Sequence, residues 1–284
     1  MRAGLLIFTL LASLSQVAAQ QSSMEPPPTV LGVVHEMKST DQAVRERAFN
    51  KASTLLASDK TPARDLDLLR MSLIQLLIAE NALNNMSMSD EEQLKNIASH
   101  PGCGDGTDNC EGDDEEDLSE SGYLPRLTAT VAAFCDERAI PALVGAMTMG
   151  DAVTTALLRF GDKALGPVVE QLKNRNPWLR MSALNMSIKL LEARNDPASR
   201  IRTKGLIESS LTDPSSIVRE NAIEQIICQD NRQDFVPILE RIAKTDPLKL
   251  SGKALDGGDG EEFYPVRSRA RQALRAIQNT KGCL

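Results

Sequence analysis

Residues 101–122 contain a cluster of acidic side chains whose chemistry would be the binding of a metal ion. Four of their aspartates offer the oxygen ligands that Ca²⁺ prefers: Asp105, Asp108, Asp113 and Asp114. If a helix-loop-helix calcium loop begins at Asp105, however, Cys110 occupies the position that requires glycine. We therefore predict a solvent-exposed acidic loop and keep calcium binding as the alternative.

Residues typical of catalytic sites are scarce. The sequence has two histidines, His35 and His100, and it lacks Gly-x-Ser-x-Gly, His-Glu-x-x-His and Gly-rich phosphate-loop motifs. General acid–base chemistry and metal centres both rely heavily on histidine. We expect no catalysis, no cofactor and no bound metal, and therefore a protein that is not an enzyme.

Five cysteines suit an oxidising compartment, where disulfides form. Cys103 and Cys110 lie close together in a glycine-rich stretch, so they are the candidate disulfide, and the sequence leaves open whether they are bridged. For Cys135 and Cys228 we expect buried thiols packed against apolar side chains. Cys283, near the end of the chain, is expected to be more exposed.

The negative charge of the chain is local. The net charge is −7, but residues 101–122 alone hold nine acidic residues and no Lys or Arg, so the rest is slightly basic. Binding to nucleic acid needs a concentrated basic face, which the overall balance opposes. We expect no nucleic-acid partner.

An element of the form apolar-Arg-x-x-Ala recurs along the chain. It occurs as Val44 to Ala48, Leu179 to Ala183, Val218 to Ala222 and Val266 to Ala270. Its last three arginines, Arg180, Arg219 and Arg267, lie 39 and 48 residues apart, and the longer gap contains a glycine-rich insertion, residues 251–262. Removing the insertion leaves a period of about 40 residues, which is typical of repeats built from helix pairs.

Each element begins a helix, because apolar residues continue from it at spacings of three and four, as in Leu179, Ala183, Met186 and Leu190. A shorter amphipathic helix precedes several of these, with Pro141, Pro167 and Pro237 near the beginnings, where proline is tolerated. The predicted unit is helix, short turn, helix. Trp178 and Tyr264 come at the turns, where we expect them to pack onto the next unit, with exposed contact residues as the alternative.

The segments DERAIPALVGAM, DKALGPVVEQLKNRNPWLRMSAL and DPSSIVRENAIEQI resemble HEAT repeats, in particular the bacterial HEAT-like repeats of phycobilisome lyases. The resemblance covers residues 136–278 well and residues 29–56 fairly. It implies an all-α fold, an α-solenoid in which antiparallel helix pairs stack into a superhelix, as in HEAT and armadillo proteins. The bilin lyase activity of that family is not expected behind an export signal.

The resemblance also implies a structural role for Arg45, Arg180, Arg219 and Arg267. In such repeats this arginine bonds to an acidic or polar residue of the preceding turn. The residues six positions earlier can all accept a hydrogen bond: Ser39, Asn174, Asp213 and Glu261. We therefore expect the four arginines to join stacked units rather than to bind a ligand.

The N-terminus reads as a secretory signal over residues 1–19, with Arg2, an apolar run from Leu5 to Leu14, and Ala19 at the cleavage site. The run is too short to span a bilayer as a helix, so we expect no membrane insertion after cleavage, with a retained anchor as the alternative. The expected location is periplasmic or extracellular.

The predicted organisation that follows the signal has five parts. They are a disordered leader at 20–28, degenerate helical repeats at 29–100, the acidic insertion at 101–122, HEAT-like repeats at 123–279 interrupted by the loop 251–262, and a tail at 280–284. Stacked helix pairs present a concave face to a protein or peptide. We expect an exported scaffold or protein-binding module. The alternative is a calcium- or ligand-binding envelope protein that uses the two acidic loops.

Overall fold

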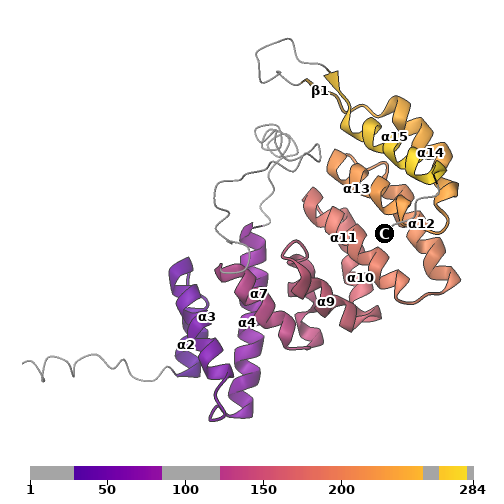
Figure 1. The fold of residues 1–284 in the computed structure, drawn as a ribbon. Helices are drawn as coiled ribbons and strands as arrows, with labels where there is room; N and C mark the ends of the chain where they lie inside the picture. The colour runs from indigo at the N-terminus through magenta and orange to yellow at the C-terminus, as the bar shows by residue number, and fades with distance from the viewer. Residues whose placement is uncertain (1–28, 85–121, 252–261, 280–284) are drawn as a thin grey trace, which may run out of the picture. The chain divides into compact units, whose positions relative to one another are not determined.

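The computed structural model describes residues 29–84, 122–251 and 262–279, which are drawn in colour in Figure 1. The predicted signal, the leader, nearly all of the acidic insertion and the C-terminal tail lie outside these residues. The chain divides into two compact units, residues 1–72 and 73–284, which are described separately. The described residues are helical apart from one short pair of strands, which confirms the predicted all-α class.

The first unit contains α2 (Val30–Glu36), α3 (Gln42–Leu56) and the beginning of α4 (Ala63–Asn84), which runs on into the second unit. Thr29 and Asp41 cap α2 and α3 by accepting main-chain N–H bonds. Lys51 on α3 pairs with Glu36 on α2 at 3.1 Å. Ala48, in the first apolar-Arg-x-x-Ala element, is fully buried, as its small side chain predicts for a close helix contact.

The second unit is a succession of helices. After the end of α4 they are α7 (Tyr123–Ala133), η1 (Glu137–Ala139), α8 (Ile140–Gly145), α9 (Asp151–Phe160), α10 (Asp162–Glu170), η2 (Gln171–Lys173), α11 (Pro177–Glu192), α12 (Pro197–Ser210), α13 (Ser216–Ile227), η3 (Arg232–Phe235), α14 (Val236–Thr245) and α15 (Pro265–Gln278). Within the residues described, none of the helices is long and apolar enough to cross a membrane.

Neighbouring helices of this unit pack as pairs, α10 with α11, α12 with α13 and α14 with α15. The second helix of each pair also packs on that of the next, so that α11, α13 and α15 lie side by side in chain order (Figure 1). Ala183, Ala222 and Ala270 are fully buried on these three helices. Each lacks a side chain beyond Cβ, which allows a neighbouring helix to approach closely.

A continuous apolar core joins the last two pairs to α11. Leu184 and Ile188 on α11, Ile207 on α12, and Phe235 just before α14 belong to one cluster of buried side chains that reaches α15. Phe235 is fully buried and is the largest of them. Burial of such side chains is the main stabilising contribution to a fold of this kind.

Two details differ from the sequence predictions. Pro167 lies inside α10, because that helix already begins at Asp162, directly after Gly161 with its positive φ of 54°. Pro141 and Pro237 do lie in the first turns of α8 and α14. The two end residues of the predicted loop 251–262 belong to strands instead. β1 (Leu250–Ser251) pairs antiparallel with β2 (Glu262–Phe263), and Leu250 lies opposite Phe263.

Candidate functional site

In three of the four repeated elements, the arginine is buried against the turn before its own helix. Arg180 and Arg219 are each about 8% exposed, and each occupies the fourth position of its helix. Arg180 Nη1 donates to the carbonyl oxygens of Asn174 at 2.8 Å and Arg175 at 3.0 Å. Arg219 Nη1 does the same with Asp213 and Pro214, at 2.8 and 2.9 Å. Each guanidinium therefore satisfies two main-chain acceptors of a partly buried turn.

Arg45 repeats this arrangement in the first unit. Its Nη1 donates to the carbonyl oxygens of Ser39 at 3.0 Å and Thr40 at 2.9 Å. Three of the four predicted arginines thus donate to the carbonyl oxygens five and six residues before them. Because this contact occurs in both compact units, it is a feature of the turn itself.

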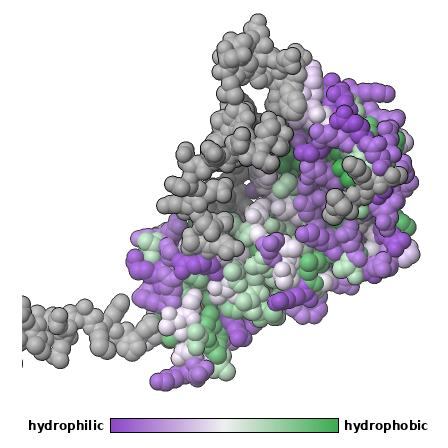
Figure 2. Space-filling model, in the orientation of Figure 1, coloured by the Kyte–Doolittle hydropathy of each residue, from purple (hydrophilic) through white to green (hydrophobic). Residues whose placement is uncertain are grey.

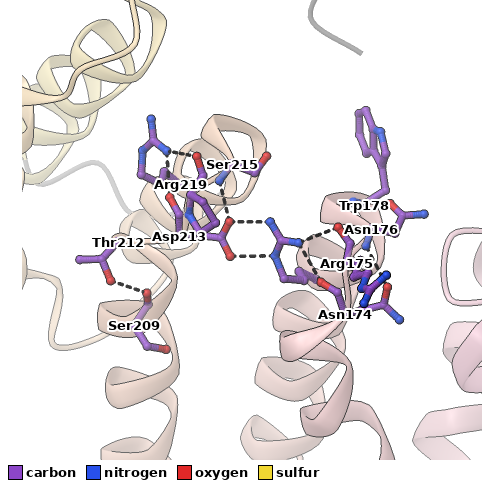
Figure 3. Close-up of polar contacts among 11 residues, drawn as sticks. Asn174, Arg175, Asn176, Trp178, Ser209, Thr212, Asp213, Ser215 and Arg219 are labelled. Carbon is purple, nitrogen blue, oxygen red and sulfur yellow. Dashed lines mark hydrogen bonds and ion pairs between the residues drawn. The ribbon is translucent and has the colours of Figure 1, made fainter. Parts of the chain in front are cut away.

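The remaining N–H groups of Arg180 and Arg219 reach the following helix pair. Arg180 Nε and Nη2 donate to the two carboxylate oxygens of Asp213, both at 2.8 Å (Figure 3). Arg219 donates in the same way to Asp246, at 2.8 and 3.1 Å. Planar guanidinium and carboxylate groups match in such a fork, which fixes their orientation as well as their distance.

The two aspartates also order their own turns. Asp213 accepts the N–H of Ser215 at 2.8 Å, and Asp246 accepts the N–H of Leu248 at 3.0 Å. Arg267 Nε then donates to the carbonyl oxygen of Asp246 at 2.7 Å. A continuous set of hydrogen bonds therefore joins three successive turns. We call it the arginine–aspartate ladder, and its members are Arg180, Asp213, Arg219, Asp246 and Arg267.

The acceptors of the arginines differ in part from those predicted from the sequence. Ser39, Asn174 and Asp213 accept from their arginines through main-chain oxygens, which are available whatever the side chain. Glu261 lies outside the described residues. The carboxylate partners come instead from the next turn along the chain, and sequence reasoning missed Asp246 altogether. The signal was present: Asp213-Pro214 and Asp246-Pro247 are two Asp-Pro turns, and their aspartates come 33 and 27 residues after Arg180 and Arg219.

Trp178 lies on the edge that the ladder fixes. It is 39% exposed, which fits the alternative of an exposed contact residue. Asn176 accepts the N–H of Trp178 at 2.9 Å and caps α11, so the side chain leaves the first turn of the helix and points away from it (Figure 3). Tyr264 differs, since it is half-buried and its ring lies 4.2 Å from the guanidinium carbon of Arg267.

A hollow of about 300 Å³ lies at the turns before α13 and after α14. It is lined by Pro214, Ser215, Ser216, Ile217, Arg219, Pro247 and Leu248. Ile217 comes two residues before Arg219, as Trp178 comes two residues before Arg180. Large apolar side chains thus lie at the start of the second helix in two successive pairs, α11 and α13. We call Trp178 together with this hollow the turn edge.

A larger cavity of about 430 Å³ lies between the end of α11, the start of α12 and the segment after α13. Its polar groups already bind one another, since Gln229 donates to Glu192 and Arg200 to Asn195, both at 3.2 Å. Hydrogen bonds from the main chain and side chain of Ser199 lower the pKa of Asp196. These contacts stabilise the helix ends, so the polar groups of this cavity are already used within the fold.

Both described cysteines differ from the prediction of buried thiols. Cys228 is exposed at the end of α13 and is disulfide-bonded, with its partner outside the described residues. Cys135 is a free, exposed cysteine with a φ of 52°, because it ends α7 in a left-handed turn. The candidate pair Cys103 and Cys110 lies outside the described residues.

The described part of the chain contains no group of three or more His, Cys, Asp or Glu side chains placed to hold a metal ion. His35 lies in the last turn of α2. The aspartates of the calcium alternative lie outside the described residues, as does His100.

Comparison with known proteins gives no relative. No protein-family model matches the sequence, and no curated protein matches it.

Replacing Arg219 by alanine should lower the free energy of unfolding by about 3–5 kcal/mol, because Asp246 would remain buried without its cation. Arg219→Lys should recover only part of this loss, since an ammonium cannot bind two carbonyls and a carboxylate in one plane. Arg202→Ala, at an exposed position on α12, is the control. Urea unfolding followed by circular dichroism measures all three. Equal stability of Arg219→Ala and Arg202→Ala would contradict the role given to the ladder.

Glu220, next to Arg219, allows a test of how the burial of its charge makes the stability of the fold depend on pH. Burial raises the pKa of Glu220; Arg269 lowers it, while Glu224 and Asp246 add to the rise. Its ionised form therefore opposes folding, and this cost develops as pH rises above the ordinary pKa near 4.5.

Glu220→Gln should accordingly raise the Tm at pH 7 and leave it nearly unchanged well below the ordinary pKa. Glu208→Gln, at an exposed site on α12, is the matched control and should change little at either pH. Thermal unfolding across this pH range checks both. A stabilisation by Glu220→Gln that is independent of pH would show that burial of the charge is not its cause.

Proposed function

We propose that this chain is an exported α-solenoid of HEAT-like helix pairs that binds a protein or peptide along its turn edge. The repeated elements support the solenoid, as do the packing of α11, α13 and α15 on one another and the ladder that joins their turns. Stacks of this kind commonly act as extended binding surfaces and need no chemistry of their own.

The observation that carries the proposal is the exposed indole of Trp178 on an edge fixed by the hydrogen bonds of Asn176 and Arg180. Tryptophan is among the residues most enriched at the energetic centres of interfaces, because it buries a large area at little cost in conformational entropy. The neighbouring hollow has Pro214, Ile217 and Leu248 in its walls. A partner could place an apolar side chain there while contacting the indole.

Trp178→Ala should weaken partner binding at least tenfold, since truncation of such an anchor costs on the order of 2 kcal/mol or more. A photo-crosslinking residue at position 217, in the wall of the hollow, captures the partner from the cell envelope while Trp178 stays in place, and the affinity is then measured with the purified pair. Ile201→Ala is the matched control, because Ile201 is a large apolar residue 76% exposed on α12.

Affinity should fall in Trp178→Ala alone, with both variants unfolding at the wild-type temperature. If both variants bind as tightly as the wild type, the turn edge is not the site. If the purified protein instead turns over a substrate, the role as a binding module is wrong.

Export has its own test. The mature protein should begin at Gln20, as read by N-terminal sequencing of material from the periplasm or medium. Replacing Ala19 by a bulky residue should block processing, because signal peptidases need a small side chain there. Recovery of the uncleaved chain in the cytoplasm would contradict export.

A further inference from the structure

The last two helices carry a concentration of positive charge that the chain as a whole lacks. Between them, α14 and α15 contain six basic side chains and one acidic one, Glu240, although the net charge of the protein is −7. The surface over these helices is largely hydrophilic in the view of Figure 2. No acidic residue occurs in α15 at all.

The arginines of α15 form a row. Arg267, Arg271 and Arg275 follow one another at intervals of four residues, which places them along one side of the helix. Arg267 Nε donates to the carbonyl oxygen of Asp246 at 2.7 Å, and Arg271 Nη2 to that of Ala243 at 3.2 Å. These bonds hold the row against the C-terminal end of α14.

Four of the basic side chains are exposed, namely Arg241 and Lys244 on α14 and Arg271 and Arg275 on α15. We call these four the basic face. Arg269 is set apart from it, because it pairs with Glu224 on α13 at 3.2 Å. Like charges one helical turn apart repel each other, so Arg271 and Arg275 destabilise α15 in isolation. An anionic ligand would offset that repulsion.

We propose that the basic face binds an acidic polypeptide segment of a partner protein. This inference rests on the proposed protein-binding role, and it specifies the charge of the partner at residues distinct from those of the turn edge. Arg271 and Arg275 are separated by one helical turn, a rise of about 6 Å. Carboxylates on alternate residues of an extended chain are about 6.8 Å apart, so two of them can each meet one guanidinium in a bidentate pair.

The dimensions favour a peptide over nucleic acid. A duplex carries a charge about every 1.7 Å along its axis, and strong binding to it uses roughly six to ten phosphate contacts. The basic face offers only four cations on two helices, fewer than such binding uses. Its size matches a short acidic segment.

The test uses the mature protein and a fluorescein-labelled peptide of alternating Glu and Gly, with binding followed by fluorescence anisotropy. We expect saturable binding that weakens as ionic strength rises, because exposed charges are screened by salt. Arg271→Gln with Arg275→Gln should weaken it about tenfold, the loss of two exposed ion pairs. The control, Lys189→Gln with Arg202→Gln, removes the same charge from exposed positions on α11 and α12 and should keep the affinity within about twofold of wild type.

Three results would overturn the proposal: no binding of the peptide at low salt, an equal loss in the control, or tighter binding of oligothymidylate or of phosphatidylglycerol vesicles than of the peptide. Circular dichroism checks folding, and Arg241→Gln with Lys244→Gln replaces the first variant if that one unfolds. Trp178→Ala should bind the acidic peptide like wild type. Failure at the basic face is thereby distinguished from failure of the turn edge.

Discussion

The arrangement of the second unit depends on what happens to the carbonyl groups of the turns between helices. A turn packed partly between helix pairs removes main-chain acceptors from water in part, and an acceptor that loses both water and a donor costs about as much as a lost hydrogen bond. Arg180 and Arg219 solve this by reaching back to two carbonyls each, and their remaining N–H groups fall opposite Asp213 and Asp246 of the next pair. One side chain thus satisfies its own turn and fixes the register of the following one.

This constraint explains what could be predicted from the sequence. The arginine position, the alanine three residues later and the helical spacing of the apolar residues are all dictated locally by a helix that begins at a partly buried turn. Ala183, Ala222 and Ala270 are accordingly found fully buried, and the helices α11, α13 and α15 begin where expected.

The features that could not be predicted depend on contacts between successive helix pairs. Asp246 is an ordinary Asp-Pro residue in the sequence, and its role emerges only when α13 and α15 are stacked. Cys135 was expected to be buried, and Trp178 either to pack onto the next helix pair or to be an exposed contact residue. Each lies at a helix end, where the direction of the turn decides its exposure. Composition and periodicity describe the faces of helices well and their ends poorly.

The pairing of the short strands β1 and β2 has a consequence for which changes in length this protein tolerates during evolution. Because Leu250 lies opposite Phe263, the chain leaves and re-enters the helical stack at adjacent points. Lengthening or shortening the sequence between those points alters the closure entropy only by a logarithmic amount, about 0.6 kcal/mol per doubling, and leaves the packing of α14 on α15 as it was. The position is therefore one where evolution, or a protein engineer, can insert foreign sequence at little cost in stability.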